Sequence, residues 1–574
     1  MENKNNIEKI RHSLAHILAQ AVKKLYPKAK LGMGPAIENG FYYDFDNLKI
    51  SDSDLKNIQK EMKKIVAKDI KFKKKRITLS EAKKLFKDEE YKLELAKDLK
   101  NITIYESGDF IDLCAGPHIK SSKEINIEAF KLEKTAGAYW KGSEKNKMLT
   151  RIYGLAFENK KELSNYLQLQ EEAKKRDHRK LGKELDLFCF SDLVGPGLPL
   201  FTPKGVFVRD ALQKRVEDIC RNYGFEKVSA PALAKIELYE ISGHAKKFAD
   251  ELFHVSSAKN HDLVLKPVQC PHHTQIYASK IRSYKDLPIR YMESDKQYRA
   301  EKAGELGGLN RVYAITVEDG HSFCTVDQVK EEIKAMVEII KDFYKSLGLW
   351  ENHWVSLSVR DKKHPEKYIG EDKDWNKCEK ILQEVCEEMK LGAKKCEGEA
   401  ALYGPKIDFM FRDSLGKEIQ IPTVQIDFAT PKRFDLSYVD KDGKEKPPVM
   451  VHRAILGSYE RFMALIIEHF AGAFPLWLSP IQIQIIPISD KHESYAQSIL
   501  EKLKSEGFRV ELKNNNETLG KKIRQGQVEK VPYLLIVGDK EVKNKTIGVR
   551  EREKGDIGEM KLDKFLKKLY ALNI

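Results

Sequence analysis

Apolar and polar residues alternate with period two after a glycine-rich turn in the segment 298–324, and a basic residue and a carboxylate two apart precede that turn. The turn contains Gly304, Gly307 and Gly308, and alternation that is interrupted by glycine predicts a strand, a loop and a second strand. This hairpin is expected to combine an anion-binding group with a metal ligand. Its charged and ligand-type side chains are Arg299, Glu301, Arg311, Glu318, Asp319 and His321.

Two further alternating runs, at residues 397–411 and 417–430, predict strands that are antiparallel neighbours. Gln420 and Gln425 interrupt the second run. Because they are five residues apart, they share one face of the strand only if Pro422 introduces a bulge. A buried polar group without a partner is costly, so both glutamines are expected to face a ligand.

Changes of pattern divide the chain into parts. The lysine-rich stretch Asp54–Lys100 is predicted to be helical, and alternation at residues 128–157 is expected to close the sheet of a first domain. The basic segment 160–182 is typical of a semi-rigid helical linker. A helix between Val206 and Gly224 follows. The expected boundaries divide the chain into a first domain (1–157), a linker helix (158–177), a second domain (178–476) and a third domain (477–574).

From Ile481 onward, strand and helix patterns alternate. The runs IQIQIIPI, FRVELK, PYLLIVG and KTIGVRE predict strands, and helices are expected around 494–506, 519–529 and 563–572. This order predicts a small α/β module with a mixed sheet. Basic residues near its loop ends indicate either an RNA-binding surface or a lysine-rich solvated face: Lys521, Lys522, Arg524, Lys540, Arg550 and Arg552.

Composition narrows the classes of protein. The chain of 574 residues is too long for one core, and three or four domains are expected. A formal charge of +15 favours a polyanionic partner such as nucleic acid, or else reflects a lysine-rich proteome. The eight cysteines are scattered without a CxxC pair, which is typical of a reducing compartment. No signal peptide and no apolar run near 18 residues is found, so a cytoplasmic protein without membrane contact is expected.

Histidine and cysteine gather near the N-terminus. His12 and His16 are spaced i, i+4 and lie on one helical face. Cys114 and His118 are also four apart, with a Gly-Pro turn between them. The four residues resemble a ligand set. A polar pocket that binds an ester and positions a water is an alternative, and a lone HxxxH pair is more often an ordinary helix face.

The segment VLKPVQCPHHTQIY contains Cys270, His272 and His273, which alone is weak evidence for a metal because cysteine is commonly a small buried residue. In YGFEKVSAPAL, Pro231 is expected in a strand at a sheet edge or subunit contact. Spacing alone does not connect Cys270 with ligand-type residues far along the chain.

A strand, a glycine turn and a long helix are predicted for PPVMVHRAILGSYERFMALIIEHFAG, which contains His452 and Arg461. The junction between the strand and the helix leaves backbone N–H groups free near Gly457 and Ser458. An anion could bind there beside Arg461. A helix arginine that only solvates a face is an equal alternative.

The order HxxxH, CxGPH, GFxxVxxP, KPxxCP, YRxE, DxHxFC, YGPKIDF, TVQIDF, HRAxxGSxER and VPYxLxVGDKE resembles that of the threonyl-tRNA synthetases, a family of class II aminoacyl-tRNA synthetases. The resemblance covers nearly the whole chain. It implies an α+β multidomain protein: an N-terminal α+β editing domain (1–157), a class II catalytic core on an antiparallel sheet (178–476) and a C-terminal α/β anticodon-binding domain (477–574). It also implies a form without the small domain that often precedes the editing domain.

The resemblance implies ATP-dependent ligation of L-threonine to tRNA(Thr) through threonyl-adenylate, with release of AMP and diphosphate. Arg299 would hold the α-phosphate, with Glu301 in the same motif. Arg311 and Arg461 would hold the remaining phosphates and stack on adenine, and Gln420 would lie near ATP. Mg²⁺ would enter with ATP, since phosphoryl chemistry needs positioning, metal and arginine charge.

By the same resemblance, Cys270, His321 and His452 would bind one Zn²⁺, and the amino and hydroxyl groups of threonine would complete its coordination. Valine would then be rejected because it lacks the hydroxyl group. The residues expected around the amino acid are Asp319, Tyr403 and Gln425.

Serine keeps both liganding groups and loses only a methyl group, which is worth about 1–3 kcal/mol. An editing pocket is therefore implied, which hydrolyses Ser-tRNA(Thr) without a metal. Its residues would be His12, His16, Cys114 and His118, with Asp112 as a helper. The resemblance also implies a homodimer with Pro231 at its interface, and it places Glu541 and Arg550 at the anticodon.

Three positions depart from the family pattern. Tyr313 and Val317 stand where arginine and glutamine are expected, and CPHH replaces CPGH. These changes bear on substrate affinity and on the shape of the loop. Two rival functions are a metal-dependent hydrolase of an RNA ester, which would not need ATP, and a non-enzymatic RNA-binding paralogue, which would have no reason to keep the arginines and the ligand triad.

Overall fold

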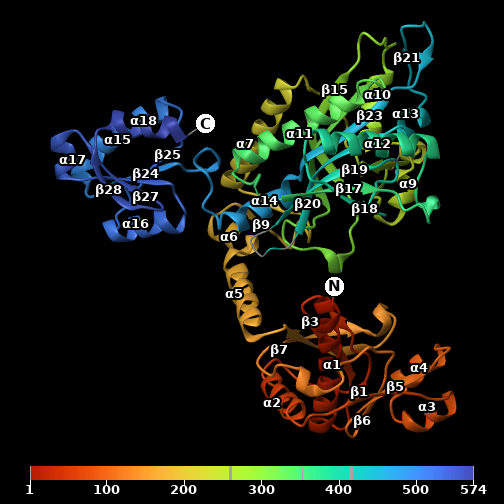
Figure 1. Cartoon of the computed structure of the whole chain (residues 1–574). Coiled ribbons are helices and arrows are strands. Elements are labelled where there is room, and N and C mark those ends of the chain that lie inside the picture. The colour runs from red at the N-terminus through yellow and green to blue at the C-terminus, as the bar shows by residue number, and fades with distance from the viewer. Residues whose placement is uncertain (1, 258–261, 352, 413–415, 417, 573–574) are drawn as a thin grey trace. The chain divides into compact units, whose positions relative to one another are not determined.

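The computed structural model describes residues 2–257, 262–351, 353–412, 416 and 418–572 (Figure 1). The chain forms two compact units, Met1–Glu172 (unit 1) and Ala173–Ile574 (unit 2). The division falls inside helix α5 (Lys160–Arg176), so a helix is present where the linker was expected. The domain boundaries at residues 157, 177 and 476 stay predictions.

Unit 1 is built around helix α1 (Glu2–Leu25), whose apolar side packs on α2 (Leu55–Val66) and on the main sheet. The sheet has the order β1-β3-β8-β7, and β2 pairs with β3. Strands β7 and β8 confirm the alternation predicted at residues 128–157. The strands are β1 (Lys30–Leu31), β2 (Ala36–Ile37), β3 (Gly40–Asp46), β7 (Phe130–Tyr139) and β8 (Met148–Ala156).

The prediction of a continuous helical stretch at Asp54–Lys100 was wrong. Strand β4 (Phe72–Arg76) interrupts it and begins a three-stranded sheet with β5 (Thr103–Ser107) and β6 (Phe110–Leu113). The lysines of β4 are exposed on an edge strand, where charge is favourable because it discourages pairing with other chains. The lysine content of β4 therefore resembled that of an exposed helix surface. Helices α3 (Leu79–Leu85) and α4 (Glu90–Lys97) follow.

The main sheet of unit 2 has eight strands in the order β11-β15-β16-β23-β20-β19-β17-β18. The central pairs are antiparallel, as predicted, while the two edge pairs, β11 with β15 and β17 with β18, are parallel. The strands are β11 (Glu226–Lys227), β15 (Ile289–Tyr298), β16 (Ala314–Cys324), β17 (His353–Val359), β18 (Lys394–Glu397), β19 (Lys406–Arg412), β20 (Glu418–Asp427) and β23 (Val449–Ser458).

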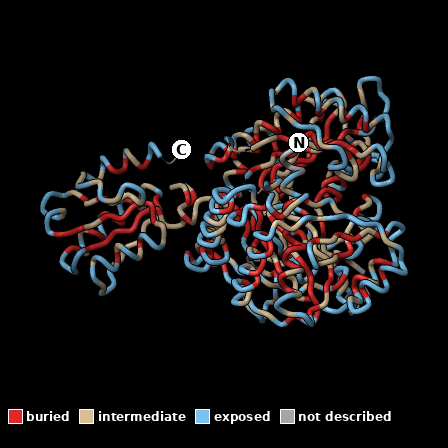
Figure 2. The backbone as a smooth tube through the Cα atoms, turned by 60° about the horizontal axis from the view of Figure 1, so that its bottom comes forward, coloured by how far each residue is buried: buried red, intermediate tan, exposed pale blue. Residues whose placement is uncertain are grey.

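Apolar faces of four helices form the largest core of unit 2 with this sheet. Buried residues appear as red stretches of the chain in Figure 2. The core helices are α7 (Pro203–Asn222), α11 (Val329–Ser346), α12 (Asp372–Glu388) and α14 (Tyr459–His469). Helix α14 begins where β23 ends, and Ser458 caps it by accepting a hydrogen bond from the Arg461 N–H. The predicted strand-to-helix junction is thus confirmed.

Two bulges shape the sheet near its centre. Between β19 and β20, Asp408 pairs with Thr423 and Met410 with Gln420, so a single residue of β19 opposes two of β20, one of which is Pro422. This confirms the bulge on which a shared face for Gln420 and Gln425 depended. The second bulge lies between β16 and β23, where the single residue Glu318 opposes the three residues 455–457.

The hairpin predicted for residues 298–324 is present as β15, a loop at 299–313 and β16, but its charged residues lie differently. Arg299 and Glu301 follow β15, and Arg311 precedes β16, so all three belong to the loop rather than to the strands. The loop forms its own turn, in which the Gly307 N–H donates to the Arg311 carbonyl at 3.2 Å. Pro231 also lies outside a strand, between β11 and β12 (Leu233–Ala234), because a residue without an N–H fits a connection better.

The C-terminal module has a five-stranded sheet in the order β25-β24-β26-β27-β28. Its first three strands are parallel and the others antiparallel, which confirms the predicted mixed sheet. Strand β28 escaped the sequence analysis because its glycines and charges hide the alternation. The strands are β24 (Ile483–Pro487), β25 (Val510–Leu512), β26 (Tyr533–Val537), β27 (Ile547–Glu551) and β28 (Gly555–Met560), and the helices are α15 (Glu493–Ser505), α16 (Leu519–Val528), α17 (Asp539–Asn544) and α18 (Leu562–Leu572).

Two of the basic residues predicted on the surface of this module have structural roles. Lys522 is buried, and its ammonium group donates to the Pro487 carbonyl at 3.4 Å. The Arg552 guanidinium donates to the carbonyls of Lys530, Ala473 and Phe474. Within the described ranges, no helix has the length and apolarity needed to cross a membrane.

Candidate active site

Strand register brings distant residues of unit 2 into one row. His321 on β16 is the cross-strand partner of His452 on β23, and His452 is in turn the partner of Gln425 on β20. Paired residues of antiparallel strands point to the same side of a sheet. The two imidazole rings therefore lie with centroids 4.7 Å apart. More than a hundred residues of sequence separate them, but the pairing of β16 with β23 places them side by side.

Cys270 completes a group with these two histidines. It begins helix α10 (Cys270–Ala278), and the ligand atoms of Cys270, His321 and His452 all lie within 4.8 Å of one another. All three residues are buried. Burial raises the pKa of the Cys270 thiol and lowers that of His321, so without a cation both groups stay neutral.

The donor set fits a zinc ion. Nδ1 of His321 lies 2.7 Å from Nδ1 of His273, while its Nε2 is buried without a hydrogen-bond partner. Nε2 of His452 lies 3.0 Å from the Asp427 carboxylate, which leaves Nδ1 of His452 available to bind a metal ion. Each histidine thus has one nitrogen held by a neighbour, the usual arrangement around protein-bound zinc.

One cavity of about 800 Å³ extends from this group along the sheet. It is large enough for a nucleotide together with an amino acid. Nearly all the residues predicted for the catalytic core line it, and His321 lies buried beside it. The lining includes Cys270, Arg299, Glu301, Arg311, Asp319, Tyr403, Gln420, Gln425, His452 and Arg461.

Cationic groups also line the cavity. The Arg299 guanidinium lies 4.8 Å from the centre of the Phe248 ring and donates to the Pro267 carbonyl at 3.3 Å. Arg311 is paired with Glu301 at 2.7 Å and with Glu305 at 2.8 Å. Partial burial and the nearby charge of Arg311 lower the pKa of Arg461. These arginines can surround a polyanion.

Further polar groups surround the metal-type ligands. The Tyr403 ring stacks on His452 with centroids 4.7 Å apart, and its hydroxyl donates to Gln425 at 2.8 Å. The carboxylate of Asp319 lies 3.6 Å from Nε2 of His321. Gln420 donates to Asp408 at 2.7 Å on the other side of the bulge. Of the departures from the family pattern, Val317 lines the cavity, whereas Tyr313 packs against Phe253.

Two residues that the sequence analysis did not assign also contribute. His244 lines the cavity, and its Nδ1 lies 2.9 Å from the Ser242 hydroxyl; burial lowers its pKa to about 4. His273 stands between His321 and Glu293, with 3.3 Å to the carboxylate. The CPHH string marked His273, but nothing in the sequence marked His244.

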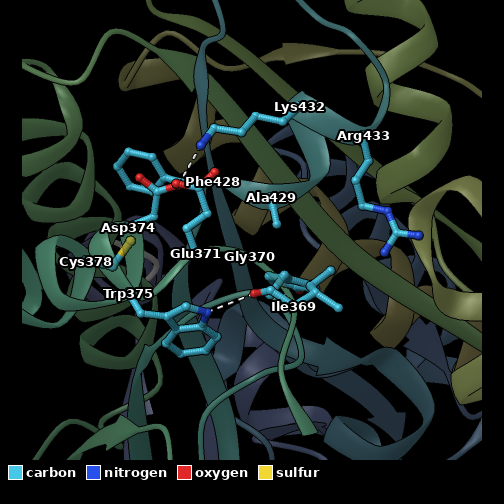
Figure 3. Close-up of a pocket in the computed structure, with 11 residues that line it drawn as sticks. Ile369, Gly370, Glu371, Asp374, Trp375, Cys378, Phe428, Ala429, Lys432 and Arg433 are labelled. Carbon is cyan, nitrogen blue, oxygen red and sulfur yellow. Dashed lines mark hydrogen bonds and ion pairs between the residues drawn. The ribbon is translucent and has the colours of Figure 1, made fainter. Parts of the chain in front are cut away.

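A smaller cavity of about 150 Å³ shares Tyr403 with the large one. Figure 3 shows side chains that line it, including Trp375, Phe428, Lys432 and Arg433. Lys432 is paired with Asp374 at 2.6 Å, and the Trp375 indole donates to the Ile369 carbonyl at 2.8 Å. Apart from Tyr403, none of the predicted site residues lines it.

Unit 1 brings its predicted residues together as well. The ligand atoms of His12, His16, Cys114 and His118 lie within 4.8 Å of one another. The Cys114 sulfur is 3.3 Å from a ring nitrogen of both His12 and His118. Burial is the main cause that lowers the pKa of all three imidazoles and raises the pKa of Cys114 to about 11. The group is therefore a set of neutral donors and acceptors.

Asp112 connects this group to residues that the sequence analysis missed. Its carboxylate is 3.7 Å from His16, and it accepts a hydrogen bond from the Tyr43 hydroxyl at 2.6 Å. Lys92 forms an ion pair with it at 2.5 Å in the interior. No signal distinguished Lys92 from the many exposed lysines around it.

The two residues predicted to contact the anticodon lie on neighbouring elements of the C-terminal module. Glu541 accepts from the Gly538 N–H at 2.9 Å and so caps helix α17. Arg550 lies on β27 and is 3.4 Å from Asp556. Both are partly exposed. Their role stays a prediction.

Family models match three parts of the chain. Residues 253–470 match the tRNA synthetase class II core domain (G, H, P, S and T), and residues 482–572 match an anticodon binding domain. Residues 102–153 match the threonyl and alanyl tRNA synthetase second additional domain. Cys114 and His118 fall within this last match, and His12 and His16 precede it.

Curated relatives match almost the entire chain. The threonine–tRNA ligase of Gloeobacter violaceus is 47% identical over 563 residues, which are 96% of this chain and 89% of the relative. That of Staphylococcus carnosus is 45% identical over 566 residues, 98% of this chain and 87% of the relative. A solved structure described as the RNA binding domain of Cryptosporidium parvum threonyl-tRNA synthetase superposes with a TM-score of 0.64 at 33% identity, over 69% of this chain and 98% of that one. The chain belongs to the threonine–tRNA ligase family.

Proposed function

We propose that the chain uses ATP to ligate L-threonine to tRNA(Thr) and hydrolyses Ser-tRNA(Thr) at a separate site. The observation that carries the first activity is the single cavity in which three arginines and a Cys-His-His group converge. A polyanion and a small polar molecule would meet there. The expected anticodon contacts Glu541 and Arg550 would select the tRNA.

In the first step, a carboxylate oxygen of threonine attacks the α-phosphorus of ATP, and diphosphate leaves with the electrons of the broken P–O bond. Arg299 would stabilise the charge that develops on the α-phosphate, because fixed charges aimed at a transition state need no reorganisation. Arg311 and Arg461 would hold the outer phosphates and the adenine. Glu301 and Gln420 would bind the nucleotide beside them, and Mg²⁺ would arrive with ATP.

In the second step, a ribose hydroxyl of tRNA attacks the carbonyl carbon of threonyl-adenylate, and AMP leaves. Asp319, Tyr403 and Gln425 would hold the amino acid in place between the two steps. Since the Tyr403 hydroxyl donates to Gln425, the two side chains orient one another. Reactants held in this way lose little further entropy in reaching the transition state.

Cys270, His321 and His452 would hold Zn²⁺ at the amino-acid end. When bound, the ion would offer open coordination positions to the amino and hydroxyl groups of threonine, and so distinguish it from valine. His273 and Asp427 would orient the two ligand histidines through the nitrogens that face them.

In unit 1, water would attack the ester carbonyl of Ser-tRNA(Thr), and serine and free tRNA would leave. The neutral imidazoles of His12, His16 and His118 would accept hydrogen bonds from that water and orient it, since burial lowers their pKa values. Cys114 and Asp112 would fix their positions. By the family resemblance, the site would do this without a metal.

We further propose a cytoplasmic homodimer with Pro231 near the interface between subunits. The connection that holds Pro231 lies beside strand β11 at the edge of the large sheet. Sheet edges are common places of subunit contact.

Threonine-dependent exchange of pyrophosphate into ATP tests the central assignment. The zinc-loaded protein should catalyse exchange with threonine and not with valine. Complete lack of exchange would refute the ligase and leave the RNA-ester hydrolase, which does not need ATP.

The zinc assignment has its own test. Cys270→Ala should lose both bound zinc and threonine exchange, whereas Cys396→Ala, at a partly exposed cysteine outside the cavity, should keep both. Elemental analysis of the zinc content of both variants tests this prediction. Full zinc occupancy in Cys270→Ala would show that the ligand set is wrong.

A further inference from the structure

His178 stands at the start of helix α6 (His178–Glu184), directly after the linker helix. It is 3% exposed, and both ring nitrogens have partners. Nδ1 donates to the Glu468 carboxylate at 2.7 Å, and Nε2 accepts from the Leu309 N–H at 3.1 Å. These bonds require the neutral tautomer with its proton on Nδ1. His178 therefore connects helix α14 with the loop at 299–313.

Each hydrogen-bond partner of His178 lies on an element that carries an arginine of the cavity. Glu468 lies seven residues after Arg461, two turns along the same face of α14, and both line the cavity. Leu309 lies two residues before Arg311 in the loop. One imidazole thus joins the element that carries Arg461 to the element that carries Arg311.

The two arginines repel each other. The charge of Arg311 is one cause that lowers the pKa of Arg461, so the groups are near enough to interact. Glu301 and Glu305 balance part of the Arg311 charge, and the remaining repulsion favours movement of the loop away from α14 before a polyanion enters. A fixed contact between the loop and the helix would oppose that movement.

The loop is built to fit His178 closely. Gly308 has a φ of +52°, and a Cβ atom at that position would overlap Nε2 of His178. The Leu309 side chain is fully buried in the main core. Backbone and side chain of the loop are therefore both fixed at this point, one by the imidazole and the other by apolar packing.

We propose that His178 is a positioning residue that holds the loop at 299–313 against α14, so that Arg311 and Arg461 converge on the phosphates of ATP. The proposal rests on the proposed ligase function for its kinetic consequence only. Preorganised cations bind a polyanion without the entropic cost of first ordering a loop.

Three substitutions separate the two hydrogen bonds. His178→Ala removes both side-chain bonds and leaves the bond from the His178 backbone N–H to Glu468 at 3.2 Å. In His178→Gln the side-chain oxygen can reach the place of Nε2 and accept from Leu309, whereas the shorter amide of His178→Asn reaches only the place of Nδ1 and can serve Glu468. Loss of the bond to a buried N–H should raise the KM for ATP about tenfold or more in the Ala and Asn variants. The KM for threonine should stay within about twofold, and Gln should restore most of the affinity for ATP.

A matched control is His492→Ala in the C-terminal module. His492 is also buried and hydrogen-bonded, to Ser489 and Asp539. Its loss should lower the melting temperature without changing the KM for ATP. An unchanged KM for ATP in His178→Ala, or equal values for the Asn and Gln variants, would overturn the proposal.

Hydrogen exchange tests the anchor without relying on activity. Peptides that contain the Leu309 amide should exchange at least about tenfold faster in His178→Ala and in Gly308→Ala than in the parent protein. The His492→Ala variant should leave them unchanged. Equal exchange in parent and His178→Ala refutes the anchor, whereas absence of threonine-dependent pyrophosphate exchange in the parent would refute only the ligase assignment.

Discussion

Lys92 shows how a single residue can escape a sequence pattern. It lies in a stretch with many lysines, yet its ammonium group is buried and pairs with Asp112 beside the histidines of unit 1. Composition describes the stretch as a whole and does not tell which lysine turns inward. In contrast, His12 and His16 were predictable because helical spacing alone places them on one face.

Removal of the Lys92 charge should be costly. Lys92→Met leaves a buried carboxylate without its cation, so the free energy of unfolding should fall by about 3–5 kcal/mol. Lys214→Met is a suitable comparison, because Lys214 pairs with Asp218 at 2.7 Å with both side chains exposed (76% and 44%), and it should lose less than about 1 kcal/mol. Urea denaturation of both variants measures the difference. Equal losses would mean that the interior pair contributes no more than a surface pair.

At the scale of elements, alternation predicted strands well where apolar residues are frequent and poorly where charge or glycine replaces them. The runs that became β7, β8, β16 and β20 were found, whereas the lysines of β4 and the glycines of β28 concealed two strands. The Cys270, His321 and His452 group came only from family resemblance. Strand register, which brings His321 beside His452, depends on pairing over long sequence distances and leaves no local signal.

Strand β16 has a position where only glycine fits. A Cβ atom at Gly320 would lie 2.5 Å from Cζ of Arg453, which is buried in an ion pair with Glu318. Gly320→Ala must displace that guanidinium, so the free energy of unfolding should fall by about 2 kcal/mol or more. Gly520→Ala in helix α16 meets nothing within 4 Å and should be neutral or slightly stabilising. Chemical denaturation compares them, and a neutral Gly320→Ala would show that Arg453 has room to move.

At the scale of the whole molecule, the two candidate sites belong to different compact units. The histidine and cysteine group of unit 1 is formed within Met1–Glu172, and the large cavity is formed within Ala173–Ile574. Each site has its own core and its own sheet. Damage to one site should therefore leave the structure of the other intact.

This separation predicts opposite phenotypes for two cysteine substitutions. Cys114→Ala should charge tRNA(Thr) with threonine at nearly the parent rate and allow Ser-tRNA(Thr) to accumulate. Cys270→Ala should fail to activate threonine but still deacylate Ser-tRNA(Thr) that is supplied to it. Assays with radiolabelled serine and threonine measure both reactions. Loss of both activities in either variant would contradict independent sites.

The bulge between β16 and β23 divides the cavity along its length. On one side, Asp319 to Cys324 pair with Val449 to Ala454 and carry the proposed amino-acid end. On the other, Val317 pairs with Ser458, just before Arg461. Extra residues of β23 are absorbed between these segments, so the register of one does not dictate the register of the other. The bulge therefore lets the two segments of the strand pair differ in register. Substitutions that re-specify the amino acid can accumulate at one end while the nucleotide grip at the other keeps its alignment.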